Sequence, residues 1–197
     1  AIATDADFKT LSNQVPYQHV LHFKITSDNN FKIGKNRMDV VVGYQRNQRQ
    51  EFGDPNNIYT PGAWFNLQTL SYAWRWHFPF SGNFKTSIGI TGMFQSNQNL
   101  AEDVLIPAYR LFDIRGYVFT QYSKNRLNVS GGIRYDARHD VADGLEISGE
   151  TKFTAFAKNF SNVSGSLGLS YEVSKSLAIK ANLARGFRAP NFAELAS

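Results

Sequence analysis

Histidines and closely spaced carboxylates are the residues of this chain that could bind a metal ion or transfer protons. The sequence has four histidines and no cysteine, so it offers no thiolate nucleophile, thiolate metal site or disulfide framework. His19 and His22 are three residues apart, and on a strand this spacing sends their side chains to opposite faces. The sequence therefore predicts no metal ligands at this pair.

Acid–base and phosphate chemistry also lack a motif. The carboxylates of Glu102 and Asp103 have no histidine, serine or second carboxylate placed beside them in a recognisable catalytic pattern. Glycine-rich fragments such as 165–168 lack the following helix and the lysine of a phosphate-binding loop. His139 begins a long loop, where an axial haem ligand is the alternative to a solvated histidine. We expect no catalytic residues, no cofactor and no enzyme activity.

Polar residues at a spacing of two are the stronger functional candidates, because on a strand they share one face. The residues that we expect to line an interior are Gln45, Asn47, Arg49, Gln95, Asn97, Arg134, Asp136 and Arg138. Charges taken out of bulk water must find partners. We therefore expect the last three to form a hydrogen-bonded network with another part of the protein, with ligand contact as the alternative.

Strict alternation of apolar and polar residues shows which elements position these side chains. From Leu127 to Tyr135 the odd positions are apolar or glycine, and the even positions are polar or glycine. The same period returns between Val163 and Val173. A period of two is the signature of a β-strand. Further segments of this kind lie near 17–26, 37–49, 63–78, 84–96, 109–122 and 177–187.

Two segments keep the period less clearly. In 63–78, Phe65 and Leu67 lie on one face while Leu70 and the tryptophans lie on the other, and a bulge near Gln68 would reconcile them. In 109–122 the phase is ambiguous, because Tyr117 and Phe119 oppose Ile114 and Val118.

Connections alternate in length along the chain. Short polar turns are centred near Phe31, Ser81, Asn125 and Lys175, and long loops lie near 51–62, 97–108 and 139–161. These strands are about twice as long as those of a soluble sandwich or propeller. Short turns at one end and long loops at the other are typical of a transmembrane β-barrel. The fold class predicted is thus all-β: an antiparallel up-and-down transmembrane β-barrel segment of about eight strands.

Strand length and aromatic placement agree with a membrane. The ten steps from Phe84 to Phe94 rise roughly 26 Å at a tilt near 40°, close to the apolar band expected for such barrels. Candidates for the girdle at the long-loop end are Tyr17, Tyr44, Phe94, Phe112, Tyr135 and Phe187, and those for the other girdle are Tyr72, Trp74, Trp76, Phe78, Phe84, Tyr122 and Tyr171. The alternative is that these aromatic residues fill a soluble core.

Composition excludes two other classes. Lysines and arginines are scattered among acidic residues, so the net charge of +5 forms no run that would indicate nucleic-acid binding. The apolar runs are too short or too interrupted for a membrane-spanning helix of roughly 20 residues.

One motif resembles a known family. The phrase Gly186-Phe187-Arg188-Ala189-Pro190-Asn191 with Glu194-Leu195 resembles the barrel motif of TonB-dependent outer-membrane receptors. Three further pieces resemble the same family in the same order: Tyr44-Gln45-Arg46-Asn47 with Arg49, Glu51 and Phe52; Leu105-Ile106-Pro107; and Gly131-Gly132-Ile133-Arg134-Tyr135-Asp136 with Arg138. Together these pieces run through most of the chain.

The resemblance implies a barrel of about 22 strands around a plug domain, in the outer membrane of a Gram-negative bacterium. It implies import of a scarce ligand, such as an iron–siderophore complex or haem, driven by the TonB energy-coupling complex through the plug. Residues 1–15 would end an extracellular loop, 16–187 would form barrel strands, and 188–197 would begin another extracellular loop. The plug would lie outside this chain, and the other partners would be outer-membrane lipid and the remaining strands.

Two alternatives stay open on the sequence alone. One is a passive porin or structural barrel of the outer membrane. The other is a soluble all-β binding module such as a propeller. A plug domain upstream would favour the receptor, whereas a complete short chain in the soluble fraction would favour the module.

Overall fold

Long antiparallel strands make up nearly all of the protein. A computed structural model describes residues 5, 9, 15–78 and 82–195. Its elements are β1 (Tyr17–Ile33), β2 (Asn36–Phe52), β3 (Ala63–His77), β4 (Phe84–Asn99), β5 (Tyr109–Lys124), β6 (Leu127–Ala142), β7 (Leu145–Ile147), β8 (Glu150–Phe153), β9 (Phe156–Ser174), β10 (Leu177–Arg185) and the short helix α1 (Phe192–Leu195). Within the described residues no helix is long and apolar enough to cross a membrane.

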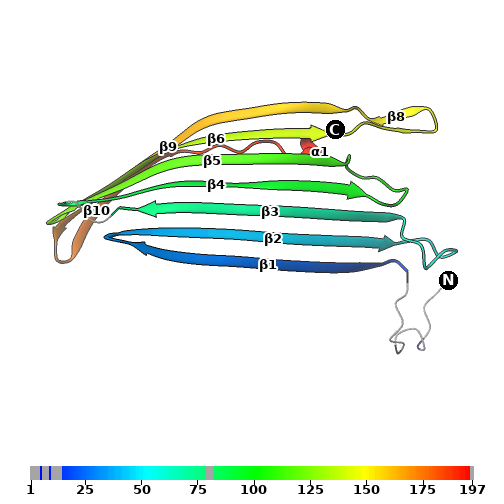
Figure 1. The fold of residues 1–197 in the computed structure, drawn as a ribbon, viewed down its shortest axis with the longest axis horizontal. Helices are drawn as coiled ribbons and strands as arrows, with labels where there is room; N and C mark the ends of the chain where they lie inside the picture. Colours follow the sequence, from blue (N-terminus) through cyan, green and yellow to red (C-terminus); the bar gives the residue numbers. More distant parts are fainter. Residues whose placement is uncertain (1–4, 6–8, 10–14, 79–81, 196–197) are drawn as a thin grey trace.

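Eight of these strands form one open sheet in the order β1-β2-β3-β4-β5-β6-β9-β10, and β7 pairs with β8 in a separate hairpin. All short turns lie at one end of the sheet and the long loops at the other (Figure 1). The predicted all-β segment of about eight up-and-down strands is therefore confirmed, although the described part is an open sheet and not a closed barrel.

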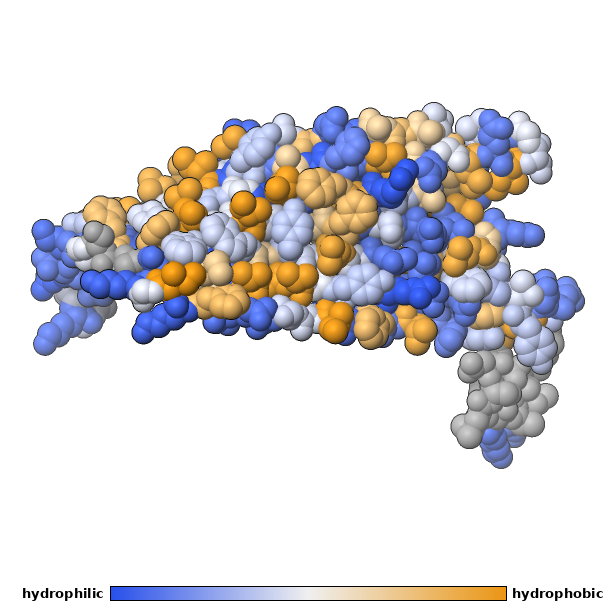
Figure 2. All heavy atoms as spheres, viewed as in Figure 1, coloured by the Kyte–Doolittle hydropathy of each residue, from blue (hydrophilic) through white to orange (hydrophobic). Residues whose placement is uncertain are grey.

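The alternation gives the sheet two chemically different faces. Antiparallel partners share a face, so the pairing Ile25–Tyr44–Leu70–Phe94–Phe112 continues one apolar row across five strands. We call this side the apolar face and the opposite side the polar face. On the apolar face Ile133 is 68% exposed and Leu183 is 76% exposed. Hydrophobic residues thus gather between two hydrophilic ends, on a surface that none of the other described elements covers (Figure 2).

The apolar band crosses the strands obliquely. Its limit at the long-loop end lies at Tyr44 in β2, at Tyr135 in β6 and at Leu183 in β10. By the pairing, this limit moves about eight residues toward the short turns over six strand steps. With ~3.3 Å per residue and ~4.8 Å per strand, a level band requires strands tilted by about 40°. This is the tilt of a transmembrane barrel wall.

Most strands are longer than the sequence pattern indicated, because pairing continues where the apolar alternation lapses. The segments expected at 63–78 and 177–187 instead end at His77 and Arg185. The turn expected near Phe31 is wrong, since β1 runs to Ile33 and the turn lies at Gly34 and Lys35. The loop expected at 139–161 is shorter, because β6 continues to Ala142 and β9 begins at Phe156. The turn predicted near Ser81 falls outside the described residues.

The bulge expected near Gln68 is also wrong. Residues 63–77 pair with 37–51 without a register shift. Phe65 and Leu67 consequently lie on the polar face, opposite Arg49 and Asn47 near the long-loop end. The pattern changes phase there because the apolar face has become polar beyond its band, with Arg46 and Asn66 joined by a hydrogen bond of 2.9 Å.

Aromatic side chains lie over glycines where the phase was ambiguous. In β5, Ile114 and Val118 occupy the apolar face, whereas Tyr117 lies across Gly89 on the polar face. On the apolar face Tyr72 lies across Gly92, and its hydroxyl donates to the Asp113 carbonyl at 3.2 Å. A Cβ on Gly92 would meet both that carbonyl and the Tyr72 hydroxyl. These contacts replace the side-chain packing that glycine cannot supply to a strand.

Replacing Gly92 tests this packing. We expect Gly92→Ala to lower the free energy of unfolding by about 1–3 kcal/mol, because the new methyl group overpacks the site. The control is Gly116→Ala on the neighbouring strand, where a Cβ meets nothing within 4 Å. Thermal unfolding followed by circular dichroism measures both. Equal losses in the two variants would contradict the proposed role of Tyr72.

Candidate functional site

The predicted interior residues all lie on the polar face. The register places Gln45, Asn47 and Arg49 of β2 on the same face and at the same level as Gln95 and Asn97 of β4, with β3 between the two strands. Arg134, Asp136 and Arg138 share the same face on β6. The structure therefore divides the eight residues between an amide group on β2 and β4 and a charged group on β6.

Hydrogen bonds hold the amide group across the strands. Gln95 Nε2 donates to Thr69 Oγ1 at 3.0 Å, and its Oε1 accepts from the Tyr109 hydroxyl at 3.0 Å. Asn97 is buried, and its Nδ2 donates to Asn99 Oδ1 at 3.4 Å. Tyr109 of β5 lies between this amide group and the charged group of β6.

The rest of the amide group is more open to solvent. Asn47 bonds His22 at 3.0 Å, and Arg49 forms an ion pair of 2.6 Å with Glu51. His19 bonds Gln50 on the opposite face, so the two N-terminal histidines lie on different sides of the sheet. Among the described residues, no three histidine or carboxylate side chains gather closely enough to hold a metal ion.

Asp113 and Arg115 of β5 extend the charged group of β6, and Asp113 lies at the centre of the enlarged group. Its Oδ2 accepts from Arg115 at 2.9 Å and from Arg138 at 3.0 Å. The neighbouring carboxylate of Asp136 pairs with Arg134 at 2.9 Å and with Arg115 at 3.5 Å. Both carboxylates are buried, and such charge-assisted bonds order the arginines into one network across β5 and β6.

The chain returns over this network after β10. Phe192 stacks on Tyr109 with ring centroids 3.8 Å apart, and it completes a small buried cluster with Leu111 and Ala142. We call residues 186–195 the returning segment. Figure 1 shows it running along the sheet to α1, beside β5 and β6.

The family motif residues build the returning segment. Ala189 is buried, whereas Phe187 and Pro190 are half-buried. Phe187 therefore does not belong to an aromatic girdle, because β10 ends at Arg185 and the ring borders a cavity on the polar face. Leu195 closes α1 by donating its N–H to the Asn191 carbonyl at 3.1 Å.

Glu194 fixes the shape of this segment. It accepts from Arg188 at 2.8 Å and from the Asn191 N–H at 2.9 Å, while its own N–H donates to the Asn191 side chain. The Arg188 hydrogen bond, followed by that of the Asn191 backbone, lowers the pKa of Glu194. The reciprocal bonds with Asn191 are those of a capping box.

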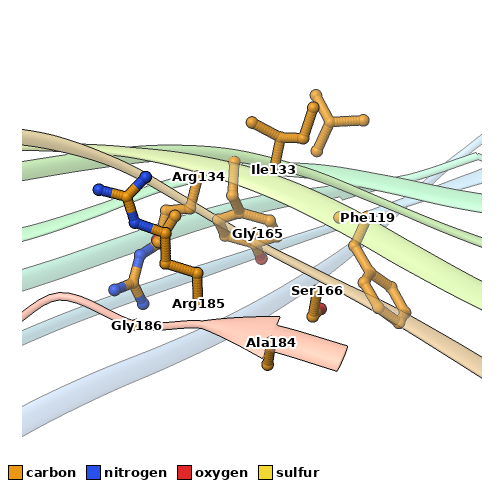
Figure 3. Close-up of a pocket in the computed structure, with 12 residues that line it drawn as sticks. Phe119, Ile133, Arg134, Gly165, Ser166, Ala184, Arg185 and Gly186 are labelled. Carbon is orange, nitrogen blue, oxygen red and sulfur yellow. The ribbon is translucent and has the colours of Figure 1, made fainter. Parts of the chain in front are cut away.

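Two hollows lie between the returning segment and the sheet. One, of about 210 Å³, is lined by Phe187, Arg188 and Ala189 together with the charged group of β5 and β6. The other, of about 420 Å³, is bordered by Gly186, Arg185 and Arg134 (Figure 3). Arginines thus surround the space beneath the segment.

Several buried oxygens on the polar face have no donor within the described residues. They are Asp113 Oδ1, both carboxylate oxygens of Asp140, and Asp39 Oδ1. Asp39 uses its other oxygen for Arg37 at 3.0 Å and His77 at 2.9 Å, near the short turns. Buried acceptors are rarely left unpaired in a complete protein. The polar face therefore has the chemistry of a surface that meets further donors.

Sequence reasoning missed the carboxylate at the centre of the network. Asp113 and Arg115 lie in the segment whose phase was ambiguous, so their face was not assigned. The available signal was their spacing of two, which mirrors that of Arg134 and Asp136 on the next strand. The Asp39–His77 pair was missed because only the strand register brings the two residues together. Asp140 was missed because its burial depends on the neighbouring strands.

Removing the central charge tests the network. We expect Asp113→Asn to lower the free energy of unfolding by about 2–3 kcal/mol, because Arg115 and Arg138 lose a buried counter-charge. Glu51→Gln is the control, since its ion pair with Arg49 is largely solvated and contributes below ~1 kcal/mol. Urea unfolding measures both variants. A smaller loss for Asp113→Asn than for Glu51→Gln would contradict the network.

Comparison with known proteins gives a family for this sheet. The family described as "TonB dependent receptor-like, beta-barrel" matches residues 3–197. The ferric yersiniabactin uptake receptor FyuA of Yersinia pestis has a similar fold, with a TM-score of 0.57 and 10% sequence identity over 85% of this chain. The aligned part is 28% of the FyuA chain. The comparison with curated protein sequences finds no match. With its tilted strands, exposed apolar band and polar face, the chain belongs to the TonB-dependent receptor β-barrel family, a family of receptors and not of enzymes.

Proposed function

We propose that this chain forms part of the wall of an outer-membrane receptor that imports a scarce iron complex. The observation that carries the proposal is the division of one continuous sheet into an exposed apolar face and a charged, partly buried polar face. The apolar face contacts lipid, and the polar face lines the interior of the barrel. Family membership supports this reading.

The connections orient the wall. The short turns lie in the periplasm and the long loops outside the cell, as in other transmembrane barrels. Residues 1–15 and 188–197 then belong to the extracellular end. The returning segment lies against the interior wall there, since Phe192 packs on Leu111 and Ala142.

The plug domain is the partner that the polar face fits. Asp113 Oδ1 and Asp39 Oδ1 are buried acceptors at two heights of the wall, and neither has a donor in the part of the chain that the structure describes. Plug side chains and their ordered water supply the missing donors. Through the plug, the TonB complex delivers the energy for release of the ligand.

Among the two cargoes expected from the family, the histidine positions favour an iron–siderophore complex over haem. His139 bonds Asn159 at 2.6 Å and lies on the apolar face, so it points away from the interior where haem would pass. His22 and His77 are on the polar face, but His22 bonds Asn47 and His77 bonds Asp39. The amide group and the arginines offer hydrogen bonds to the oxygen-rich surface of an iron chelate.

Iron uptake by cells tests this function. We expect cells with the full-length receptor to take up at least one radiolabelled ferric siderophore, and a protonophore to abolish uptake. The matched variants are Asp113→Asn in the polar network and Glu51→Gln as control, with uptake lowered several-fold only in the first.

Two results would sink the proposal. One is uptake that continues undiminished in the presence of the protonophore. The other is free passage of small sugars into liposomes that contain the receptor without uptake of any iron complex, which is the behaviour of a passive pore.

A further inference from the structure

Charge is distributed unequally between the two ends of the sheet. At the short-turn end the basic residues within two positions of a turn are Lys32, Lys35, Arg37, Lys85, Lys124, Arg126 and Lys175. The long connections between the strands of the main sheet, including the β7–β8 hairpin, contain Asp54, Glu102, Asp103, Asp143, Glu146 and Glu150, with Lys152 as their basic residue. The short-turn end is therefore positive and the loop end negative.

Little at the short-turn end neutralises these cations. Asp39 is already bound by Arg37 and His77. Glu172 is exposed and forms no ion pair within the described residues. Lys35, Lys124 and Lys175 are likewise exposed, and none takes part in an ion pair in that part of the chain.

The cations lie directly beyond the apolar band. Lys124 pairs in register with Leu127 on the apolar face, two residues after Tyr122. Tyr122 itself packs on Phe84 with ring centroids 4.8 Å apart. Aromatic rings of this kind mark the depth at which acyl chains give way to headgroups. Lys124 thus lies just beyond the hydrocarbon region of the bilayer, at the depth of the headgroups.

Two other turns repeat this arrangement. Lys35 follows Ile33, which is 44% exposed, and Lys175 lies between the exposed Val173 and Leu177. Arg126 is tied to the neighbouring turn, because its Nη1 donates to the Val173 carbonyl at 3.2 Å. The cations of three of the four short turns therefore form one row at headgroup depth, which we call the basic rim: Lys35, Lys124, Arg126 and Lys175.

We propose that the basic rim binds the phosphate groups of anionic phospholipids in the periplasmic leaflet. The proposal rests on the orientation given by the proposed function. Long lysine side chains lay their methylenes along the apolar band and place the ammonium group among phosphates. Several cations at one depth attract anionic lipid more strongly than zwitterionic lipid. An acidic soluble protein would meet the same charges but gains nothing from the adjoining apolar band, so lipid is the better occupant.

Lipid selectivity of the full-length receptor tests the rim. In nanodiscs, spin-labelled phosphatidylglycerol should associate with the receptor about fivefold more strongly than spin-labelled phosphatidylcholine. The triple variant Lys35→Gln, Lys124→Gln, Lys175→Gln should bring that ratio close to one. High salt should lower the wild-type ratio, because it screens exposed charges. The control removes three exposed lysines elsewhere: Lys9→Gln, Lys152→Gln, Lys158→Gln.

Each outcome decides the proposal. A ratio that falls in the rim variant and stays high in the control supports it. A wild-type ratio near one, or equal falls in both variants, overturns it. Reaction of a Lys124→Cys variant in intact cells with a thiol reagent added outside would also overturn the proposal, because the basic rim would then face outward. Iron uptake measured in the same strains separates the two claims: energised uptake without lipid selectivity sinks the rim alone, and selectivity without uptake sinks the import function alone.

Discussion

The structure of this protein depends on alternation along strands whose register carries the same two faces from one strand to the next. Among the described residues the main sheet has one register shift, between Leu177 and Ala178 at the start of β10. A single apolar face results because antiparallel partners carry it across eight strands. A slip of one residue in any pair would send Leu167 or Ile133 to the charged side. The free-energy cost of moving apolar side chains to the charged face fixes the register. The register in turn fixes the strand tilt of about 40° at which the apolar band lies level with a membrane.

The polar face obeys a second constraint. Charges out of bulk solvent need partners, and the arginines of β5 and β6 find them in Asp113 and Asp136. The returning segment then covers part of this network, with Phe192 stacked on Tyr109. Its motif thus has a structural reason in this chain: Arg188 and Glu194 fix the turn that brings Phe192 onto the wall. Asp140 and Asp39 have buried carboxylate oxygens without a donor among the described residues, so this face leaves acceptors for further donors.

The sequence was sufficient to predict the strands, their two faces and the shared polar face of residues such as Arg134 and Gln95. Those features depend on local periodicity, which one strand displays by itself. Cross-strand features were not predictable in the same way. Asp113 accepts a hydrogen bond from Arg138 on the next strand, 25 residues away, and only the pairing of the two strands reveals this contact.

The errors have the same origin. Phe65 and Leu67 suggested a bulge because a single strand does not show that its apolar face ends and becomes polar. Phe187 was placed among girdle aromatics because the sequence does not show where pairing stops and the chain turns back. In both cases a neighbouring strand, and not the local pattern, decides the position.

The central claim is that one face meets lipid and the other an interior, and adjacent residues of β9 test it most directly. Single cysteines at Leu167→Cys and Ser166→Cys in the full-length receptor would be reacted with a thiol probe dissolved in the bilayer. The account predicts fast labelling at position 167 and little at position 166. Equal labelling, or faster labelling at position 166, would contradict it.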